Sequence, residues 1–213
     1  MAKINSGIFG PLSGKLGPII GGNWKGIPYI RENKVREIKK PRTAAQLANE
    51  AKFKFVNDWL VPFQPYLNIG FENLAIRKTA LAAAFSANYK TVFSGTAPDI
   101  LVDYDKLQIS TGLLAPLMNP QVSFAAGGTL EITWSKNAVK GTTFNDQVML
   151  VAYSAALQQA DGFVGAVNRA NEQYSFPLNP ELYGQPLHIY ISVTSIDRRK
   201  IANSSYLGII QPI

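Results

Sequence analysis

The sequence predicts an α+β protein in three parts. These are a basic, glycine-rich N-terminal segment of short strands or an extended arm, a two-helix hairpin, and a C-terminal antiparallel β-sandwich. Seven of the first 30 residues are glycine, apolar residues then recur every four positions, and beyond residue 100 they recur at every second position. A chain of 213 residues is long enough to bury a sizeable core without metals or disulfides.

The first 30 residues interleave glycine with isoleucine, leucine, phenylalanine, tryptophan and tyrosine. Glycine at this density excludes a stable helix, because each interior Gly costs about 1 kcal/mol relative to Ala. Short strands with bulges, or an arm that becomes ordered on a partner, are the structures that remain. Residues 31–42 follow as a charged connector that ends in Pro41-Arg42.

Two helices are predicted after this connector. Thr43 and Gln46 have the spacing of a capping box, and the apolar residues that follow at intervals of four predict a helix to about Leu60. Pro62 and Pro65 are expected to end it. A second helix is predicted from Asn73 to about Phe93, closed by Gly95, with a buried stripe made of Leu74, Leu81, Ala84, Phe85 and Tyr89.

The remainder of the chain has the period of strands. Alternation between turn clusters predicts strands at 107–110, 129–134, 147–153, 163–167, 173–176, 187–193 and 205–210. About six strands in some 95 residues is the pattern of an antiparallel sandwich. A domain boundary near Pro116 to Pro120 divides the chain into residues 1–115 and residues 116–213.

At residue level the C-terminal part resembles a fibronectin type III or immunoglobulin-like sandwich. Trp134 lies in the second strand of that part, where this fold places a core tryptophan, and Tyr190-x-Ser192-x-Thr194 followed by Asn203-Ser204-Ser205 is similar to its last two strands. The family places a corner tyrosine six residues after a leucine. Here the position six residues after Leu182 is His188, so the resemblance implies an altered or shifted corner.

The whole chain also resembles a family of bacterial proteins known only as a domain of unknown function. The matching pieces are Ser13-Gly14-Lys15-x-Gly17, Trp24-Lys25-Gly26, Arg42-Thr43-x-x-Gln46, Gly70-Phe71, Asp103-Tyr104, Trp134, Tyr190 and Ser205-Tyr206-Leu207-Gly208. The resemblance runs almost from end to end. It implies the layout of helical hairpin and sandwich, and it carries no catalytic residue.

Composition excludes several kinds of chemistry. The chain has no cysteine, which removes disulfides, thiolate nucleophiles, Cys-ligated zinc and iron–sulfur clusters. Its single histidine, His188, excludes sites that need two imidazoles. We therefore expect no enzyme, no cofactor and no metal site.

Two motifs invite catalytic interpretations that the residues do not support. Gly10-Pro11-Leu12-Ser13-Gly14-Lys15 has three residues between its glycines and lacks the Ser/Thr after the lysine, so it departs from a phosphate-binding loop. His188 has Ser192, Ser195 and Asp197 nearby but no GxSxG motif, which favours a half-buried structural histidine.

Acidic residues offer no clear site either. Asp99, Asp103 and Asp105 lack the spacing of a calcium loop, so capping, turn formation and pairing with Lys106 are the expected roles. Glu131 belongs to the polar face of a strand. A hydrolase with an unrecognised pair of carboxylates stays open as a second alternative function.

The charge of the protein is concentrated at one end. Residues 1–42 hold nine Lys/Arg and two Glu, so this segment carries the entire net charge of +7. These cations are interleaved with aromatic residues and glycines. Such a segment could bind an acidic protein surface, add a strand to a neighbouring subunit, or bind a single-stranded nucleic acid. The candidate contact residues are Lys15, Trp24, Lys25, Tyr29 and Arg31.

We expect a non-enzymatic structural or interaction protein that assembles with itself or with another protein by strand addition through the N-terminal segment. The first alternative is a nucleic-acid-associated or phage virion-type structural protein that uses the same segment. The sequence begins without a continuous apolar stretch typical of a secretory signal, and no run reaches the roughly 20 apolar residues of a membrane span. A cytoplasmic or virion-associated location is the corresponding expectation.

Overall fold

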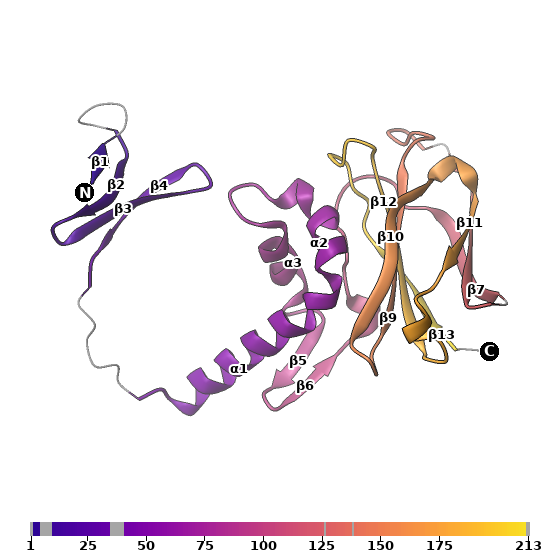
Figure 1. Cartoon of the computed structure of the whole chain (residues 1–213), viewed down its shortest axis with the longest axis horizontal. Helices are drawn as coiled ribbons and strands as arrows, with labels where there is room; N and C mark the ends of the chain where they lie inside the picture. Colours follow the sequence, from indigo (N-terminus) through magenta and orange to yellow (C-terminus); the bar gives the residue numbers. More distant parts are fainter. Residues whose placement is uncertain (1, 5–9, 35–40, 126, 138, 212–213) are drawn as a thin grey trace.

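The structure is a computed structural model that describes residues 2–4, 10–34, 41–125, 127–137 and 139–211. Along the chain it consists of a small N-terminal sheet, a helical layer with a short β-hairpin, and a two-sheet sandwich (Figure 1). The predicted α+β fold class is confirmed. Residues 35–40 of the predicted connector lie outside the described residues.

The N-terminal segment forms strands, the first of the two structures that its composition allows. Strands β1 (Lys3–Ile4), β2 (Leu12–Leu16), β3 (Ile19–Trp24) and β4 (Ile27–Glu32) pair antiparallel in chain order. Two-residue turns connect the last three strands. Gly17 has a φ of 57°, and Lys25 and Gly26 both have positive φ, as a type I′ turn requires.

The helical layer begins with the predicted first helix. Helix α1 (Ala44–Trp59) carries the predicted capping box, in which Thr43 Oγ1 accepts from the Gln46 amide and Gln46 Oε1 accepts from the Thr43 amide. Helicity continues beyond it through η1 (Val61–Phe63), α2 (Gln64–Gly70), η2 (Glu72–Leu74) and α3 (Ala80–Asn88).

The predicted bounds of the second helix were wrong. Helix α1 does end at Trp59, ahead of Pro62 as predicted. Pro62 and Pro65 also each occupy the first turn of a new helix, where a missing N–H costs nothing, so helicity restarts directly after α1. The predicted helix from Asn73 to Phe93 is reduced to α3, whose N-terminus is capped by Thr79. Gly95 does not close a helix but lies in a strand with a φ of 81°.

A hairpin and a buried extended segment join the helices to the sandwich. Strands β5 (Phe93–Thr96) and β6 (Asp99–Val102), which the sequence did not predict, precede η3 (Tyr104–Lys106). The predicted strand at 107–110 was wrong, because side chains take the place of a partner strand there. Asn88 bonds both backbone groups of Gln108, and Ser204 Oγ accepts from the Ile109 amide at 3.0 Å.

The sandwich confirms the antiparallel architecture. One sheet has the order β11-β8-β7 and the other has the order β10-β9-β12-β13. Six of the seven predicted strands are present, and β7 is an addition that the sequence did not predict. The elements are β7 (Met118–Ala125), β8 (Thr129–Ser135), β9 (Gln147–Ser154), β10 (Gln159–Asn168), η4 (Arg169–Asn171), β11 (Gln173–Pro177), η5 (Pro180–Leu182), β12 (Leu187–Thr194) and β13 (Ser205–Ile210).

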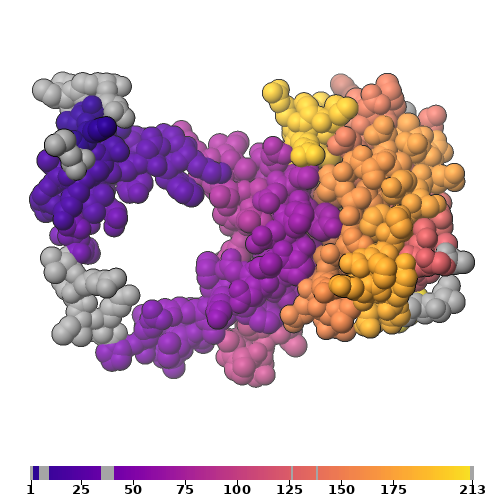
Figure 2. Space-filling view, in the orientation of Figure 1, coloured from indigo at the N-terminus to yellow at the C-terminus, as the bar shows by residue number. Residues whose placement is uncertain are grey.

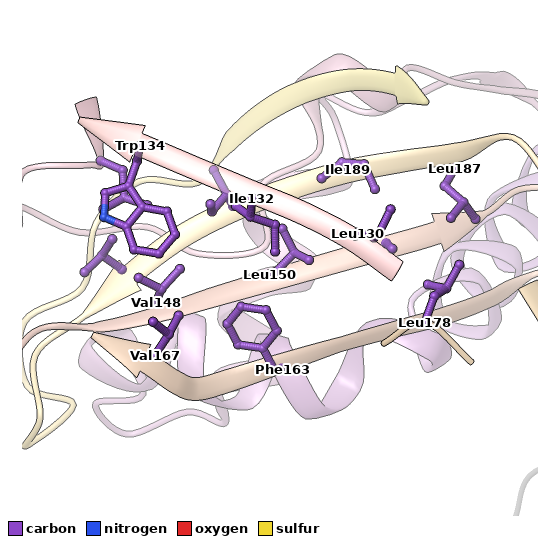
Figure 3. Packing of buried hydrophobic residues seen from close by; sticks show 14 of the residues in the cluster. Leu130, Ile132, Trp134, Val148, Leu150, Phe163, Val167, Leu178, Leu187 and Ile189 are labelled. Atoms are coloured by element: carbon purple, nitrogen blue, oxygen red, sulfur yellow. The ribbon is translucent and has the colours of Figure 1, made fainter. Parts of the chain in front are cut away.

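One hydrophobic core lies between the two sheets. Alternate residues of β8, among them Ile132 and Trp134, meet Val148 and Leu150 of β9 and Ile189 of β12 (Figure 3). Trp134 is buried, as the resemblance to a fibronectin type III sandwich implied, and its Nε1 donates to the Arg169 carbonyl at 2.8 Å. The indole ring is thus packed in the core, and its N–H group has a hydrogen-bond acceptor.

A second core lies between the four-stranded sheet and the helices. Tyr153 and Tyr190 turn away from the sandwich interior and pack with Val56, Phe63 and Leu67. Strands β9 and β12 are therefore covered on both faces, which explains why their sequences are almost continuously apolar. The sandwich strands begin at Met118, and the division into residues 1–115 and 116–213 stays a prediction.

Candidate assembly interface

Among the described residues, no other element covers either face of the N-terminal sheet. Among the described residues up to position 34, only Gly21 is buried. Large apolar side chains remain in solvent, including Trp24 at 56% exposure, Tyr29 at 45% and Ile30 at 64%. A sheet normally has to bury one face against another layer to be stable, so this sheet has the surface properties of half an interface.

Strand register sorts the side chains of the sheet onto two chemically different faces. Paired residues share a face, and the pairs Lys15 with Ile20, Ile20 with Arg31, and Trp24 with Ile27 place cations and aromatic rings together. We call this the basic-aromatic face. The opposite, aliphatic face consists of Ile4, Leu12, Leu16, Ile19 and Ile30.

A glycine shapes the basic-aromatic face. Gly22 is paired with Tyr29, and a Cβ at Gly22 would lie 2.7 Å from Cζ of the tyrosine ring. The ring therefore lies flat across the glycine. Of the five predicted contact residues, Lys15, Trp24, Tyr29 and Arg31 belong to this face.

Lys25, the fifth predicted contact residue, is at the tip of the β3–β4 hairpin. Its Nζ donates to the Lys78 carbonyl at 2.6 Å, in the segment between η2 and α3. Within the described residues this is the only side-chain hydrogen bond between the sheet and the rest of the protein. Figure 2 shows open space between the body of the sheet and α1, so one contact at its tip positions the sheet.

The free edge of β4 is poorly suited to strand addition. In a two-residue hairpin the residues that flank the turn, here Trp24 and Ile27, form a hydrogen-bonded pair. The backbone nitrogen of the next residue, Pro28, therefore points away from β3 toward the free edge. Proline has no N–H to donate to a new strand. Only the backbone amides of Ile30 and Glu32 can then donate hydrogen bonds from the free edge of β4. The faces of this sheet therefore offer more contact surface than its edge.

Helix α1 presents a second uncovered apolar surface. Its first turns and the β5–β6 hairpin line a shallow groove, which we call the α1 groove, with Leu47, Ala51 and Phe55 on one side and Pro98 and Ile100 on the other. Leu47 is 52% exposed. The four-residue repeat in the sequence predicted the helix correctly, but only its last turn is buried in the core.

The α1 groove leads into a pocket of about 360 Å³, which we call the Asp58 pocket. Phe55 lines both. Aromatic and apolar side chains form the pocket walls, and Asp58 supplies a carboxylate on the same helix face, seven residues after Ala51. The complete lining is Phe55, Asp58, Trp59, Val61, Pro62, Tyr153 and Gln158.

His188 has a structural environment. Its Nδ1 lies 2.8 Å from the Tyr206 hydroxyl, its ring stacks on Tyr104 with centroids 3.9 Å apart, and burial lowers its pKa. Ser192 is four residues along the same strand, a distance of about 13 Å, and its hydroxyl lies 2.5 Å from that of Ser110. The structure therefore does not bring His188 and Ser192 together as a catalytic pair.

In the acidic cluster the predicted pairing with Lys106 is present at Asp103, whereas Asp103 does not cap η3 with its side chain and Asp99 lies in strand β6. Asp103 pairs with Lys106 at 2.5 Å, and its pKa is lowered by hydrogen bonds with Asp105 and Lys106. Among the described residues no group of three histidine, aspartate or glutamate side chains is arranged to hold a metal ion. Lys15 of the glycine-rich motif lies within strand β2, not in a loop before a helix, so the geometry of a phosphate-binding loop is not present at this lysine.

Comparison with protein families decides the classification. The model of a family of unknown function, DUF6266, matches residues 11–208. The chain belongs to this family. The match includes β2, β3 and β4, so the DUF6266 architecture includes these N-terminal strands as well as the helices and the sandwich.

Other comparisons add little to the DUF6266 assignment. No curated protein matches the sequence. Among solved structures, the chain is similar to the solution structure of the fn3 domain of human collagen alpha-1(XX) chain, with 15% identity and a TM-score of 0.35 over 48% of this chain and 88% of that domain. Within the described residues, no helix has both the length and the apolar character to cross a membrane.

Proposed function

We propose that this protein is a non-enzymatic assembly protein whose N-terminal sheet docks on another protein molecule. The observation that carries the proposal is a four-stranded sheet with large apolar side chains exposed on both faces. Burial of apolar area stabilises by about 25 cal/mol per Å², so covering such a sheet is favourable. The sandwich and the helices have their own cores, to which no described residue of the sheet contributes.

Deletion of residues 2–42 tests this function. The remaining chain keeps both cores and is expected to fold, which circular dichroism and a cooperative thermal transition would establish. We expect the full-length protein to form oligomers by light scattering after gel filtration, and the deletion variant to be monomeric. The same oligomer in both proteins, or a monomer in both cases without binding to a protein partner, would contradict an assembly function.

Nucleic-acid binding is the second candidate function, because register places Lys15, Arg31, Trp24 and Tyr29 on one face. Cations that follow a phosphate backbone and rings that stack on bases are the elements of single-strand binding. Such binding is strongest at low salt, where counterion release contributes most. Fluorescence anisotropy with a labelled single-stranded DNA at low salt tests it, and absence of binding there would exclude this function.

A further inference from the structure

We propose that the α1 groove of one molecule receives strand β4 of a second copy, with Arg31 of that copy entering the Asp58 pocket. This inference rests on the proposed assembly function and names the surface that would receive the N-terminal sheet. It concerns the basic-aromatic face of β4, which carries Ile27, Tyr29 and Arg31.

The chemistry of the Asp58 pocket selects a cationic side chain. Trp59 and Phe55 offer aromatic faces, and Asp58 offers a carboxylate at the wall of the same pocket. A guanidinium group can stack on an aromatic ring while it donates two hydrogen bonds to a carboxylate. Arginine meets both requirements in one planar group, which lysine does not.

The charges around the receiving surface point to the same ligand. Asp58 is exposed at the pocket, and Asp99 is exposed next to Pro98 of the α1 groove. Neither carboxylate forms an ion pair with another described residue. Lys52, the cation of α1 nearest to the hairpin, is occupied by the carbonyls of Phe93 and Gly95. The aliphatic face of the sheet offers no cation for these carboxylates, whereas the basic-aromatic face does.

The lengths of strand and groove agree. From Ile27 to Arg31 a strand advances about 14 Å. From Ala48 to Asp58 a helix advances about 15 Å. With Arg31 at Asp58, Ile27 comes to lie near Ala48. Tyr29, about 7 Å from Arg31 along the strand, comes to lie between Ala51 and Phe55.

A second copy is the occupant that this arrangement favours. The sheet of the same chain is positioned by Lys25 against Lys78, with open space between the sheet and α1 (Figure 2). In a two-fold dimer each copy supplies one strand and one groove, so the same contact forms twice and the assembly closes. The α1 groove and the basic-aromatic face of the sheet would then be buried together.

Site-specific disulfides test the geometry directly, since the natural chain contains no cysteine. A tagged Ile27→Cys variant is mixed with an untagged Ala48→Cys variant at high protein concentration under mild oxidation. We expect a cross-linked species that carries both chains. The matched control replaces Ile27→Cys by Ile30→Cys, which lies on the opposite face of β4 and should give no cross-link with Ala48→Cys.

Charge reversal tests the predicted ion pair in solution. Arg31→Glu and Asp58→Arg should each raise the dissociation constant of the full-length dimer by about 30-fold or more, and the double variant should recover most of the affinity. Glu131→Arg, on the outer face of the three-stranded sheet, is the matched control and should leave the constant unchanged. Sedimentation equilibrium measures all five proteins.

The outcomes separate this inference from the proposed function. If full-length protein self-associates, the deletion of residues 2–42 abolishes it, and Asp58→Arg has no effect, the assembly function stands and the α1 groove is not the receptor. If Ile30→Cys cross-links to Ala48→Cys and Ile27→Cys does not, the aliphatic face is the docking face and our assignment is overturned. A full-length protein that is monomeric at every concentration overturns the second copy as occupant.

Discussion

Arg169 and Asp146 form an ion pair inside the sandwich, with Nε 3.1 Å from Oδ2 and side chains that are 4% and 1% exposed. Arg169 also donates to the carbonyls of Ala115 and Pro116, at 2.6 and 3.2 Å, and to Asn137 Oδ1 at 2.6 Å. The guanidinium therefore binds the segment that leads from the helical layer into β7. Burial lowers the pKa of Arg169, and Asp146 opposes this effect.

Replacement of Arg169 should destabilise the protein strongly. Arg169→Met leaves Asp146 buried without its cation and leaves the Ala115 carbonyl without its side-chain donor, whereas the Pro116 carbonyl keeps a hydrogen bond from Asn137. Removing one partner of a buried pair costs about 3–5 kcal/mol. We expect a loss of that size in urea denaturation.

The exposed pair of Arg199 and Asp197, with an N···O distance of 3.9 Å, provides the control. Pairs of this kind contribute about 0–1 kcal/mol, so Arg199→Met should change stability little. Similar losses of unfolding free energy in the two variants would show that the buried Arg169 network contributes no more to stability than an exposed ion pair.

Acidification should destabilise the protein through His188. Burial holds its folded-state pKa below the ordinary value of 6.5, so below that pH the unfolded chain binds more protons than the folded one. Stability contributed by neutral His188 is present above about pH 6.5 and decreases as the pH falls toward the folded-state pKa.

The His188 effect is measured by difference. Between pH 7.5 and pH 5.5 the wild type should lose up to about 1 kcal/mol more than His188→Gln, which keeps a hydrogen-bonding side chain beside Tyr206. Urea denaturation of both proteins at the two pH values gives this difference. An equal loss in the two proteins would assign the pH dependence to other groups.

The capping box of α1 should control local rather than global stability. Thr43→Ala removes a cap that contributes about 1 kcal/mol to a helix end. The first turns of α1 belong to neither core, so at concentrations where the protein is monomeric we expect amide exchange in residues 44–50 to accelerate about fivefold with little change in melting temperature.

The cap of α3 is the matched control for α1. Thr79 accepts from the Ala82 amide in the same way, but α3 buries Ala83 and Ala84. Thr79→Ala should therefore lower the melting temperature. A larger global effect for Thr43→Ala than for Thr79→Ala would indicate that the start of α1 is packed against another surface.

The sandwich was largely predictable because its strands alternate between core and outer face. Leu130, Ile132 and Trp134 show this period directly. Strand β7 was missed because Pro120 lies within it and because Asn119, Pro120 and Gln121 separate Met118 from its other apolar residues. The segment 107–110 has the alternation of a strand, yet its backbone bonds to side chains of Asn88 and Ser204, which no local pattern could reveal.

The sequence offered the residues of the candidate interface, and it did not indicate how they are arranged. Composition selected Lys15, Trp24, Tyr29 and Arg31, whereas strand register, which places them on one face, depends on the turns at Gly17 and Lys25-Gly26. The α1 groove was hidden because its apolar repeat has the same period as a buried helix face. Periodicity reports which side of a helix is apolar, and it does not report whether anything covers that side.

Trp24 should report assembly in solution. It lies on the basic-aromatic face beside Ile27 and is 56% exposed, while Trp134 is buried and Trp59 is half-buried. If β4 of one copy enters the α1 groove of another, the indole of Trp24 is partly removed from water. Acrylamide should then quench tryptophan emission less at high protein concentration than at low concentration. Trp24→Phe should reduce this dependence to the smaller contribution of Trp59, which lines the Asp58 pocket, because Trp134 is shielded in every state. If quenching is independent of concentration in the wild type while light scattering detects dimers, the dimer leaves this face in water and uses a different surface.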